Sequence, residues 1–586
     1  MNEQSGRIVK VFSVFVVFII IALLLCLFTL GKILGPNHIP FWQSKRIQVA
    51  TRGSIYSDDN FDLASSQVLY KVSINTLSID PDKRELFINL FSIYSGMSRE
   101  ELQAKLKQKG YIVFSYNIPA NVAANLRQLR SKLLAYDVFR EYQDSSGRIV
   151  QKMGIDVEVS GINRNYAYND ALEPVLGYVK KREARSVTIP EGVKGLEKYY
   201  NKELSPKQNG IERGDRDIRG NIIRNKTTIL RERINGSDIA LHVNLGLQRK
   251  VEKMLDEFYQ QYQVDEIVAG VMDPKSGAIF ALATTNRFDP KNITSNHALN
   301  ASVTERPFEP GSTIKPIVFS ILLDKNLINP LELIDLNKGF LQLGRYTIKD
   351  DIYPKKNSIV QDILIRSSNV GMIKISRKLS GKEFYEGLKS FGISEASGID
   401  LPYERDGVIP SIRKLSGEAY KASASYGYGL TTTFIQLLRA YGVFCNNGIL
   451  VTPHLIKNIT DPDGKITTPT FPTRQAIAAP TARKIQEILI KTVQEGTGKR
   501  AKIDNLIVGG KTGTARIAKS GGGYSDNIYN GSFFGFVKGG NQTYVIGVVV
   551  FGTQHKEDYY GSQTAAPIFK EIARIMQKQN FFKEQK

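Results

Sequence analysis

The sequence contains few of the residues that build most metal and redox sites. Its 586 residues include only two cysteines and five histidines. Cys26 lies in an apolar run and Cys445 lies far along the chain, so the spacing does not favour a disulfide, and the cysteine count does not decide the compartment. The histidines show no metal-ligand spacing; they stand at positions 38, 242, 297, 454 and 555. Zinc chemistry and a histidine-dependent triad are therefore disfavoured, and we expect no metal and no cofactor.

Acidic residues are also scarce relative to basic ones. The chain carries 57 Asp and Glu against 79 Lys and Arg, a net charge of +22. Such an excess suits nucleic acid, an anionic membrane surface or an acidic polymer. The basic residues are spread out, with only short clusters such as KKREAR (residues 180–185), and no nucleic-acid module is recognisable. We therefore expect no nucleic-acid partner.

Only one hydrophobic run is long enough to matter for membrane insertion. Residues 11–31 read VFSVFVVFIIIALLLCLFTLG, without a charge and about the ~20 residues that a spanning helix needs. No small-residue cleavage signature follows, so we predict an uncleaved anchor rather than a removed signal peptide. Residues 1–10 are then a cytoplasmic tail and residues 32–50 a juxtamembrane linker. The flanking charges do not choose an orientation, but long domains translocate largely regardless of charge, so we expect the large part to be exported.

After the linker, the first region is predicted to run over residues 51–235 with mixed structure. Residues 99–110 and 123–142 show helical patterns, and DVEVSG (156–161) is strand-like. A polar, glycine-rich stretch at 205–221 reads as the loop that closes the region.

The second region is predicted to span residues 236–580. It begins with a long amphipathic helix, followed at 266–283 by two apolar runs around Asp-Pro-Lys-Ser-Gly, which is typical of a strand pair. Near its end the pattern predicts three strands and a terminal helix, with Lys-Gly-Gly-Asn-Gln joining two strands as an antiparallel hairpin. This order predicts an α+β domain in which helices pack on an antiparallel sheet. At 586 residues, the chain as a whole is expected to hold two or more soluble domains.

A Ser-x-x-Lys pair at Ser312 and Lys315 is the first candidate for chemistry. A Pro-Gly pair precedes it and an apolar helix follows it. Residues at positions i and i+3 of a helix lie on one face, and a lysine on an apolar helix loses solvation, which lowers its pKa. A neutral amine beside the hydroxyl can take its proton. The alternative is a helix-capping serine with a solvated lysine, and Ser411 with Lys414 forms a second pair of the same spacing.

Two further patterns follow in order along the chain. SSNVG supplies Ser367 and Asn369, and GGKTGTAR supplies Lys511 in the one Lys-Thr-Gly of the sequence, on a predicted strand. Glycine in a strand permits close backbone approach, and threonine hydroxyls with a lysine can hold a carboxylate. Ser-x-Asn by itself is common here, since it also occurs at Ser73/Asn75, Ser115/Asn117 and Ser525/Asn527.

The ordered set resembles that of the penicilloyl serine transferases, which are the penicillin-binding proteins and their serine β-lactamase relatives. Other segments resemble class B penicillin-binding proteins, and the YGYGL form looks more like the division-specific type than the elongation type. These segments are TRGSIYSDDNFDLA (51–64), GVKGLEKYYNKEL (192–204), VMDPKSGAIFALA (271–283), FEPGSTIKP (308–316) and SYGYGLTTTFIQLLRAYGVFCNNG (425–448). The resemblance implies a pedestal domain followed by a transpeptidase domain, with an antiparallel five-stranded sheet flanked by helices as in serine β-lactamases.

The resemblance also implies roles for the catalytic residues of a peptidoglycan D,D-transpeptidase. Ser312 would attack the penultimate D-alanine carbonyl of a stem peptide, and Lys315 would take its proton. Ser367, assisted by Lys511, would relay a proton to the leaving amine. Asn369 would orient the base and bind the donor amide.

For substrate binding, the resemblance implies that Thr512 and Thr514, with Gly513 between them, hold the terminal carboxylate. The backbone N–H groups of Ser312 and Thr514 would form the oxyanion hole. The implied partners are peptidoglycan stem peptides, β-lactam antibiotics, and a membrane-embedded glycosyltransferase with other proteins of the division machinery. The implied location is the cell inner membrane at the septum, with the large part outside the cytoplasm.

Several alternatives stay open at this point. A β-lactamase shares the site but is typically about half this length and lacks a pedestal. A bifunctional class A enzyme would need a glycosyltransferase domain, of which residues 51–235 show no signature. An elongation-type enzyme, or a non-catalytic β-lactam sensor or scaffold, would carry similar segments.

Overall fold

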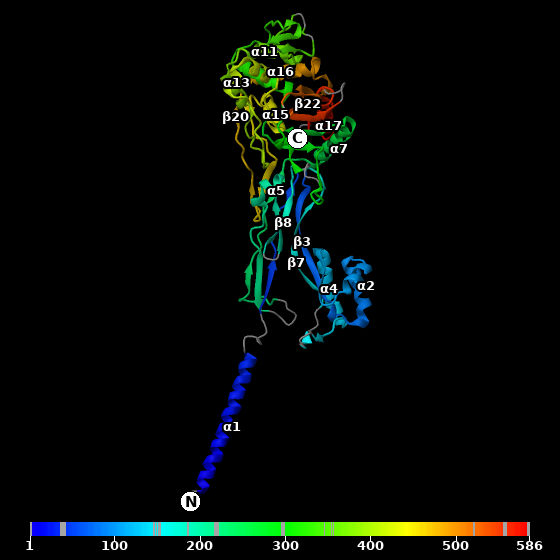
Figure 1. Cartoon of the computed structure of the whole chain (residues 1–586), viewed down its shortest axis with the longest axis vertical. Coiled ribbons are helices and arrows are strands. Elements are labelled where there is room, and N and C mark those ends of the chain that lie inside the picture. The colour runs from blue at the N-terminus through cyan, green and yellow to red at the C-terminus, as the bar shows by residue number, and fades with distance from the viewer. Residues whose placement is uncertain are drawn as a thin grey trace. The chain divides into compact units, whose positions relative to one another are not determined.

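The computed structural model describes most of the chain and separates it into two compact units (Figure 1). The described residues are 3–34, 43–143, 147, 149–150, 154–184, 187–215, 222–294, 299–344, 346–352, 354, 357–519, 522–554 and 560–582. One unit comprises residues 1–50 with 207–234, and the other comprises residues 51–206 with 235–586.

The first unit contains the N-terminal helix and a small sheet. Helix α1 (Glu3–Leu34) includes the stretch Gly6–Lys32, which is the one candidate membrane span in the described part of the chain. Its apolar side chains are exposed on every side, as expected for a helix whose solvent is lipid. The sheet is antiparallel and has the order β1-β10-β11. Its strands are β1 (Gln43–Gln48), β10 (Gly210–Asp215) and β11 (Ile229–Arg231).

The second unit begins with a sheet that carries helices at one end. Helices α2 and α4 pack together on β3 and β4, around an aromatic cluster of Phe87, Phe91, Phe114 and Phe139. The elements of this part are β2 (Ile55–Tyr56), β3 (Asp62–Asn75), α2 (Arg84–Ser95), α3 (Arg99–Leu106), β4 (Tyr111–Pro119), α4 (Ala120–Ala135), β5 (Tyr142–Gln143), β6 (Ile149–Val150), β7 (Asp156–Tyr166), β8 (Val179–Ala184), β9 (Val187–Gly192), α5 (Gly195–Tyr199) and α6 (Asn201–Leu204).

Strands from the C-terminal part of the chain extend this sheet. The order is β19-β18-β12-β2-β3-β7-β9-β8, with β4 also paired to β3. The joining strands are β12 (Asp238–Leu241), β18 (Ile456–Thr460) and β19 (Ile466–Thr467). Strand β12 pairs in parallel with β2 and antiparallel with β18, so segments far apart in the sequence share one set of backbone hydrogen bonds.

Five strands in the described part of the chain form an antiparallel sheet with the order β14-β13-β23-β22-β21. They are β13 (Glu266–Met272), β14 (Ile279–Thr284), β21 (Ile507–Ala518), β22 (Tyr524–Gly539) and β23 (Gln542–Thr553). The hairpin of β22 and β23 closes through Gly540, whose φ of 55° suits a tight turn. The predicted hairpin, the strand pair around Asp-Pro-Lys-Ser-Gly and the flanked antiparallel sheet are confirmed.

Helices cover both faces of this sheet because its side chains alternate. In β13, Ile267 and Ala269 face a core built with α7 and α17, whereas Val268 faces the larger core built with α9 and α15. The helices are α7 (Leu245–Tyr262), α8 (Ser302–Glu305), α9 (Lys315–Asp324), α10 (Asp362–Ile365), α11 (Asn369–Ser376), α12 (Gly381–Ser390), α13 (Ile412–Ser416), α14 (Glu418–Ser425), α15 (Phe434–Gly442), α16 (Ala479–Glu495) and α17 (Ala565–Lys578). A short hairpin joins β15 (Phe340–Leu343) to β16 (Tyr346–Lys349), and β17 (Ile449–Leu450) pairs antiparallel with β20 (Arg474–Gln475) across the intervening β18 and β19.

Two local predictions are wrong. The helix expected over 123–142 ends at Ala135, because Asp137 adopts a left-handed conformation (φ 53°) and the chain then enters β5. The loop expected at 205–221 contains strand β10, which forms because β1 and β11 supply partners on both sides. Both outcomes depend on contacts that a local pattern does not encode. The two cysteines are unpaired, as expected.

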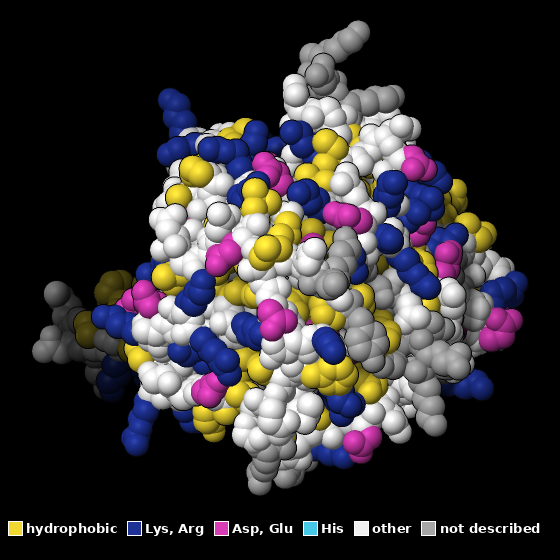
Figure 2. Space-filling model, turned by 90° about the horizontal axis from the view of Figure 1, so that it is seen from above, with side chains coloured by type: hydrophobic (Ala, Val, Ile, Leu, Met, Phe, Trp, Pro, Cys, Tyr) yellow, Lys and Arg dark blue, Asp and Glu magenta, His cyan; other side chains and the backbone are white. Residues whose placement is uncertain are grey.

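Basic side chains are scattered rather than gathered on the face seen in Figure 2. Dark-blue Lys and Arg side chains alternate there with apolar side chains and fewer acidic ones. The distribution agrees with the spread of Lys and Arg along the sequence and does not outline a single basic groove on that face.

Candidate active site

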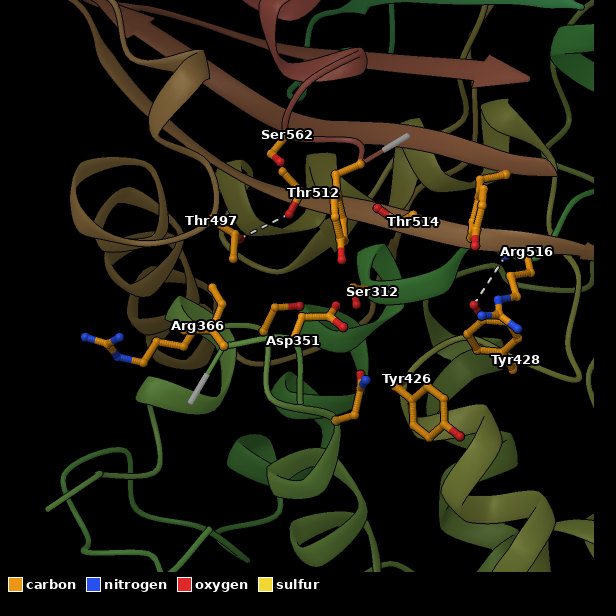
Figure 3. A pocket seen from close by; sticks show the side chains of 15 residues that line it. Ser312, Asp351, Arg366, Tyr426, Tyr428, Thr497, Thr512, Thr514, Arg516 and Ser562 are labelled. Atoms are coloured by element: carbon orange, nitrogen blue, oxygen red, sulfur yellow. Dashed lines mark hydrogen bonds between the residues drawn. The ribbon is translucent and has the colours of Figure 1, made fainter. Parts of the chain in front are cut away.

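A cavity of about 480 Å³ lies where β21 passes the start of α9 (Figure 3). Ser312, Ser367 and Asn369 line it together with Thr512 and Thr514 from β21. The structure therefore brings into one cavity residues from all three sequence patterns. They come from positions up to 202 apart in the chain.

Ser312 lies in a short 3₁₀ turn, η4 (Gly311–Ile314), and the α-helix begins only at Lys315. The expected α-helical first turn is therefore tighter than predicted. A 3₁₀ turn has three residues per turn, so side chains at i and i+3 eclipse one another. The turn thus places the Ser312 and Lys315 side chains on the same side. Its backbone is fixed by the Tyr441 hydroxyl, which donates to the Thr313 carbonyl at 2.8 Å.

Lys315 is fully buried and its amine is held by three acceptors. Nζ donates to the Ser367 carbonyl at 2.7 Å, to Asn369 Oδ1 at 2.7 Å and to Ser367 Oγ at 3.2 Å. Burial lowers the pKa of Lys315 to about 7, against an opposing effect of Asp350 and Asp351. Near neutral pH the amine therefore exists in both protonation states.

No hydrogen bond joins Ser312 to Lys315 among the described residues. A lysine ammonium has three protons to donate, and three acceptors already take them. Loss of one proton would free a lone pair, which is the form that can accept from a hydroxyl. Ser367 and Asn369, which hold the amine, line the same cavity as Ser312, so the amine lies directly behind the cavity wall.

Ser367 holds a strained backbone conformation. Its φ is 60°, a left-handed conformation that is uncommon for a residue other than glycine. Asp350 stabilises the segment that follows: its carboxylate accepts from Ser368 Oγ at 2.6 Å and from the backbone N–H groups of Asn369 and Val370 at 2.6 and 3.0 Å. This turn presents both the carbonyl and the hydroxyl of Ser367 to the buried amine.

Strand β21 supplies the opposite wall of the cavity. Lys511 is fully buried, and its pKa is lowered well below the usual range by loss of solvation and by the nearby Lys315. Its Nζ donates to the Thr512 carbonyl at 3.1 Å. Thr512 in turn donates to Thr497 Oγ1 at 3.1 Å, as the dashed line in Figure 3 marks, and Thr514 Oγ1 accepts from the Gly561 N–H at 3.0 Å. The strand thus offers hydroxyls beside a buried lysine amine.

Glycines allow β21 to approach the serine turn. A Cβ at Gly513 would lie 2.4 Å from Ser532 Oγ and 2.8 Å from a Thr313 methyl. A Cβ at Gly311, whose φ is 53°, would lie 2.8 Å from the Thr514 carbonyl oxygen. The backbone of the serine turn and that of β21 are therefore in direct contact, which side chains at these positions would prevent.

Sequence reasoning missed several residues of the site. Thr497 lies in the loop after α16, and its EGTGKR context carries only a turn signal. Tyr426 and Tyr428 were noted only as part of YGYGL, yet both line the cavity, and the Tyr428 hydroxyl accepts from the Arg516 N–H at 3.3 Å. Asp350, in KDD, shows no motif at all. The decoy Ser411 instead caps α13 by accepting from the Lys414 N–H at 3.4 Å.

Among the described residues, no group of three or more His, Cys, Asp or Glu side chains is placed to hold a metal ion. His242 and His454 contact each other, with ring centroids 5.4 Å apart, but neither lines the cavity. His38, His297 and His555 lie outside the described residues.

Comparison with family models assigns two regions of the chain. Residues 267–574, more than half of the chain, match the model of the penicillin binding protein transpeptidase domain. Residues 47–241 match the model of the penicillin-binding protein dimerisation domain. The cavity residues all lie within the first match.

Individual proteins are similar over long stretches. The penicillin-binding protein PbpB of Mycolicibacterium smegmatis is 29% identical over 62% of this chain, which spans only 58% of the length of that relative. The probable peptidoglycan D,D-transpeptidase PenA of Neisseria meningitidis is 28% identical over 83% of this chain and 80% of its own length. This chain is also similar in structure to penicillin binding protein 3 from Mycobacterium tuberculosis, solved as a crystal structure complexed with aztreonam. The superposition covers 91% of this chain and 97% of that protein's chain, with a TM-score of 0.65 and 23% sequence identity.

Proposed function

Because the chain belongs to the family of penicillin-binding protein transpeptidases, as a class B member, we propose that it is a serine-type peptidoglycan D,D-transpeptidase without a glycosyltransferase domain. We propose residues 51–235 as the pedestal and residues 236–580 as the transpeptidase domain. The observation that carries the proposal is the buried Lys315 amine, held by Ser367 and Asn369 at the wall of a cavity that Ser312 and β21 also line.

In the first step, Ser312 Oγ attacks the carbonyl carbon of the penultimate D-alanine of a stem peptide. Its proton moves to the neutral Lys315 amine, and a tetrahedral oxyanion forms. The C–N bond to the terminal D-alanine then breaks, and that nitrogen takes a proton delivered from Lys315 through Ser367 Oγ, which lies 3.2 Å from Nζ. D-alanine leaves, and an ester links the remaining stem to the serine.

In the second step, the amine of a neighbouring stem attacks the ester carbon. Ser367 and Lys315 accept its proton, and the oxygen of Ser312 leaves and regains a proton. An amide cross-link results and the enzyme returns to its starting state. A β-lactam would acylate Ser312 by the same first step, but opening of its ring leaves the amine attached to the acyl group.

Strand β21 supports binding of the donor's terminal carboxylate. Thr512 and Thr514 project hydroxyls toward the cavity, and Lys511 lies behind them. We propose that the N–H groups of Ser312 and Thr514 bind the oxyanion, since the two backbones touch at Gly311. One such donor typically contributes about 2.7–4 kcal/mol to catalysis.

Mass spectrometry after incubation with penicillin tests the site. We expect a single covalent adduct on the peptide that contains Ser312, absent in Ser312→Ala and retained in Ser411→Ala, the matched serine of the second Ser-x-x-Lys pair. Release of D-alanine from a D-Ala-D-Ala-terminated stem peptide with an acceptor amine tests the reaction. An adduct that survives Ser312→Ala would disprove the assignment, and rapid hydrolysis of penicillin would favour a β-lactamase instead.

We also propose a place for this activity in the cell. The apolar α1 supports a single-pass anchor in the inner membrane, with the catalytic part outside the cytoplasm. The YGYGL segment, Tyr426 to Leu430, favours a septal role with a membrane-embedded glycosyltransferase and other division proteins as partners. Fluorescence microscopy of a tagged chain distinguishes septal from side-wall placement, and failure of Ser312→Ala to support growth separates an enzyme from a non-catalytic scaffold or sensor.

A further inference from the structure

One face of the small β1-β10-β11 sheet gathers cations and aliphatic side chains. Residues directly opposite each other in an antiparallel pair project to the same face, and the face alternates along each strand. The register therefore forms three rows on one face. They are Gln43–Asp215, Lys45–Arg213–Ile229 and Ile47–Ile211–Arg231.

The acidic side chain in these rows, Asp215, accepts from Asn225 Nδ2 at 3.2 Å, and the cations of this face form no ion pair with it. Lys45 stands directly opposite Arg213, an arrangement of like charges that costs stability when nothing neutralises it. Arg213 donates only to the neutral Gln43 Oε1, at 3.2 and 3.1 Å, and Arg231 donates to the Asn209 carbonyl at 3.2 Å. Within the part of the chain that the structure describes, none of the three forms an ion pair.

The opposite face of the same sheet differs in its ion pairing. There Glu212 stands opposite Arg46 and forms an ion pair with Arg224 at 2.7 Å. Among the described residues, the ion pair of this sheet therefore lies on the opposite face, whereas Lys45, Arg213 and Arg231 have none. In the sequence, residues 43–50 and 207–234 together carry ten Lys and Arg against four Asp and Glu, a net charge of +6.

Aliphatic side chains beside these cations are exposed to solvent. Ile47 is 50% exposed and Ile229 is 59% exposed, while Lys45, Arg213 and Arg231 are also exposed. A face that mixes exposed aliphatic groups with unneutralised cations suits an anionic surface with an apolar layer beneath it. Lipid headgroups above acyl chains have that composition.

The chain itself places such a surface within reach. Helix α1 ends at Leu34 and β1 begins at Gln43, so nine residue steps separate the anchor from the sheet. Nine residues span at most about 30 Å when fully extended, which keeps the sheet close to the membrane surface on the side where α1 emerges. A tether of that length makes docking effectively intramolecular.

We propose that this face, defined by Lys45, Ile47, Arg213, Ile229 and Arg231, docks on anionic phospholipid headgroups of the membrane that α1 spans. The cations bind the phosphates, and the two isoleucines reach toward the acyl boundary. The docking orients the sheet to which the anchor is joined. This inference rests on the sheet and the anchor alone and is independent of the chemistry at Ser312.

Hydrogen–deuterium exchange of the full-length protein in nanodiscs tests the proposal. In phosphatidylglycerol-containing nanodiscs we expect slower exchange of the peptides that cover residues 43–48 and 229–231 than in pure phosphatidylcholine, and loss of the difference at high salt. The variant K45Q/R213Q/R231Q should lose the difference at low salt too. Its docking constant should fall roughly a hundred-fold, since each cation near an anionic surface contributes about a five-fold factor.

The control variant K180Q/K181Q/R182Q removes the same charge from exposed positions on β8 and should keep the difference. Penicillin labelling of Ser312 checks that both variants are folded, and the salt dependence of the unsubstituted protein remains decisive if a variant fails to fold. Equal exchange in the two lipids overturns the proposal. Protection that appears only when a membrane protein partner is added assigns the face to a protein and overturns it as well.

Discussion

The protonation of Lys315 should govern the pH dependence of acylation. Its pKa is lowered to about 7, because the amine is fully buried. If the neutral amine is the base, about one-tenth of the protein is active at pH 6 and about nine-tenths at pH 8. The rate of acylation by a fluorescent penicillin should therefore rise about ten-fold between these values and then level off.

Replacing Asp351 by Asn tests whether the deprotonation of Lys315 causes the rising limb of the pH–rate profile. The Asp351 carboxylate favours the ammonium form, so its removal lowers the pKa of Lys315 and moves the rising limb to lower pH. Asp351 is exposed and lines the cavity, so the substitution changes charge with little effect on packing. The Asp504→Asn variant removes an equal charge from an exposed position outside the cavity and should leave the limb in place.

Stopped-flow measurement at saturating penicillin separates the chemical step from binding. This matters because Asp351 also raises the pKa of Lys511, which lies beside the proposed carboxylate site. A rate that is flat across the neutral range would refute the assignment of Lys315 as the base. So would a limb that moves to higher pH in Asp351→Asn, since the sign of the charge effect allows only the opposite shift.

Four further outcomes are expected. Gly513→Ala should force β21 away from the serine turn, with a stability loss of about 1–3 kcal/mol in thermal unfolding and a much larger relative loss of penicillin labelling. Glu197→Ala should destabilise the protein by about 3–5 kcal/mol in denaturant unfolding, because it leaves two buried arginine guanidiniums without their carboxylate. Glu158→Ala, which breaks a largely exposed ion pair, should cost only about 0–1 kcal/mol. Thr497→Val should slow acylation without lowering the melting temperature, because it removes the hydroxyl that accepts from Thr512; an unchanged rate would exclude Thr497 from the site.

The sequence predicted the parts of the site that depend on local pattern. Ser312 and Lys315 adjoin a Pro-Gly entry and an apolar helix, and Lys511 lies in a strand with glycines, so local features alone singled these residues out as candidates. Asp350 was not found, because its three hydrogen bonds go to residues 18–20 positions later in the chain and nothing near it marks it. The left-handed conformation of Ser367 was also unpredictable, since serine does not favour it.

The same distinction applies to the fold. Two apolar runs around the turn sequence Asp-Pro-Lys-Ser-Gly in 266–283 predicted β13 and β14, because a strand pair joined by a short turn sets its own register. Strand β10 was missed because its partners lie about 165 residues before it and about 15 residues after it, and its own sequence, GIERGD, is mostly polar and glycine. Elements that depend on neighbouring residues could be predicted from the sequence. Strands that depend on pairing between distant segments could not.

The continuity of the sheet that joins β2 to β12 limits how this protein can be divided. A chain that starts at Asp238 would retain β12 but lose the neighbour that pairs with Ile239 and Ala240, leaving an open strand edge. Open edges recruit other strands, so such a fragment should scatter light at concentrations where the whole chain does not. The part of the chain from Asp238 onward is therefore not an independent module. Inhibitor screens on that fragment alone would test a protein whose sheet has an altered edge.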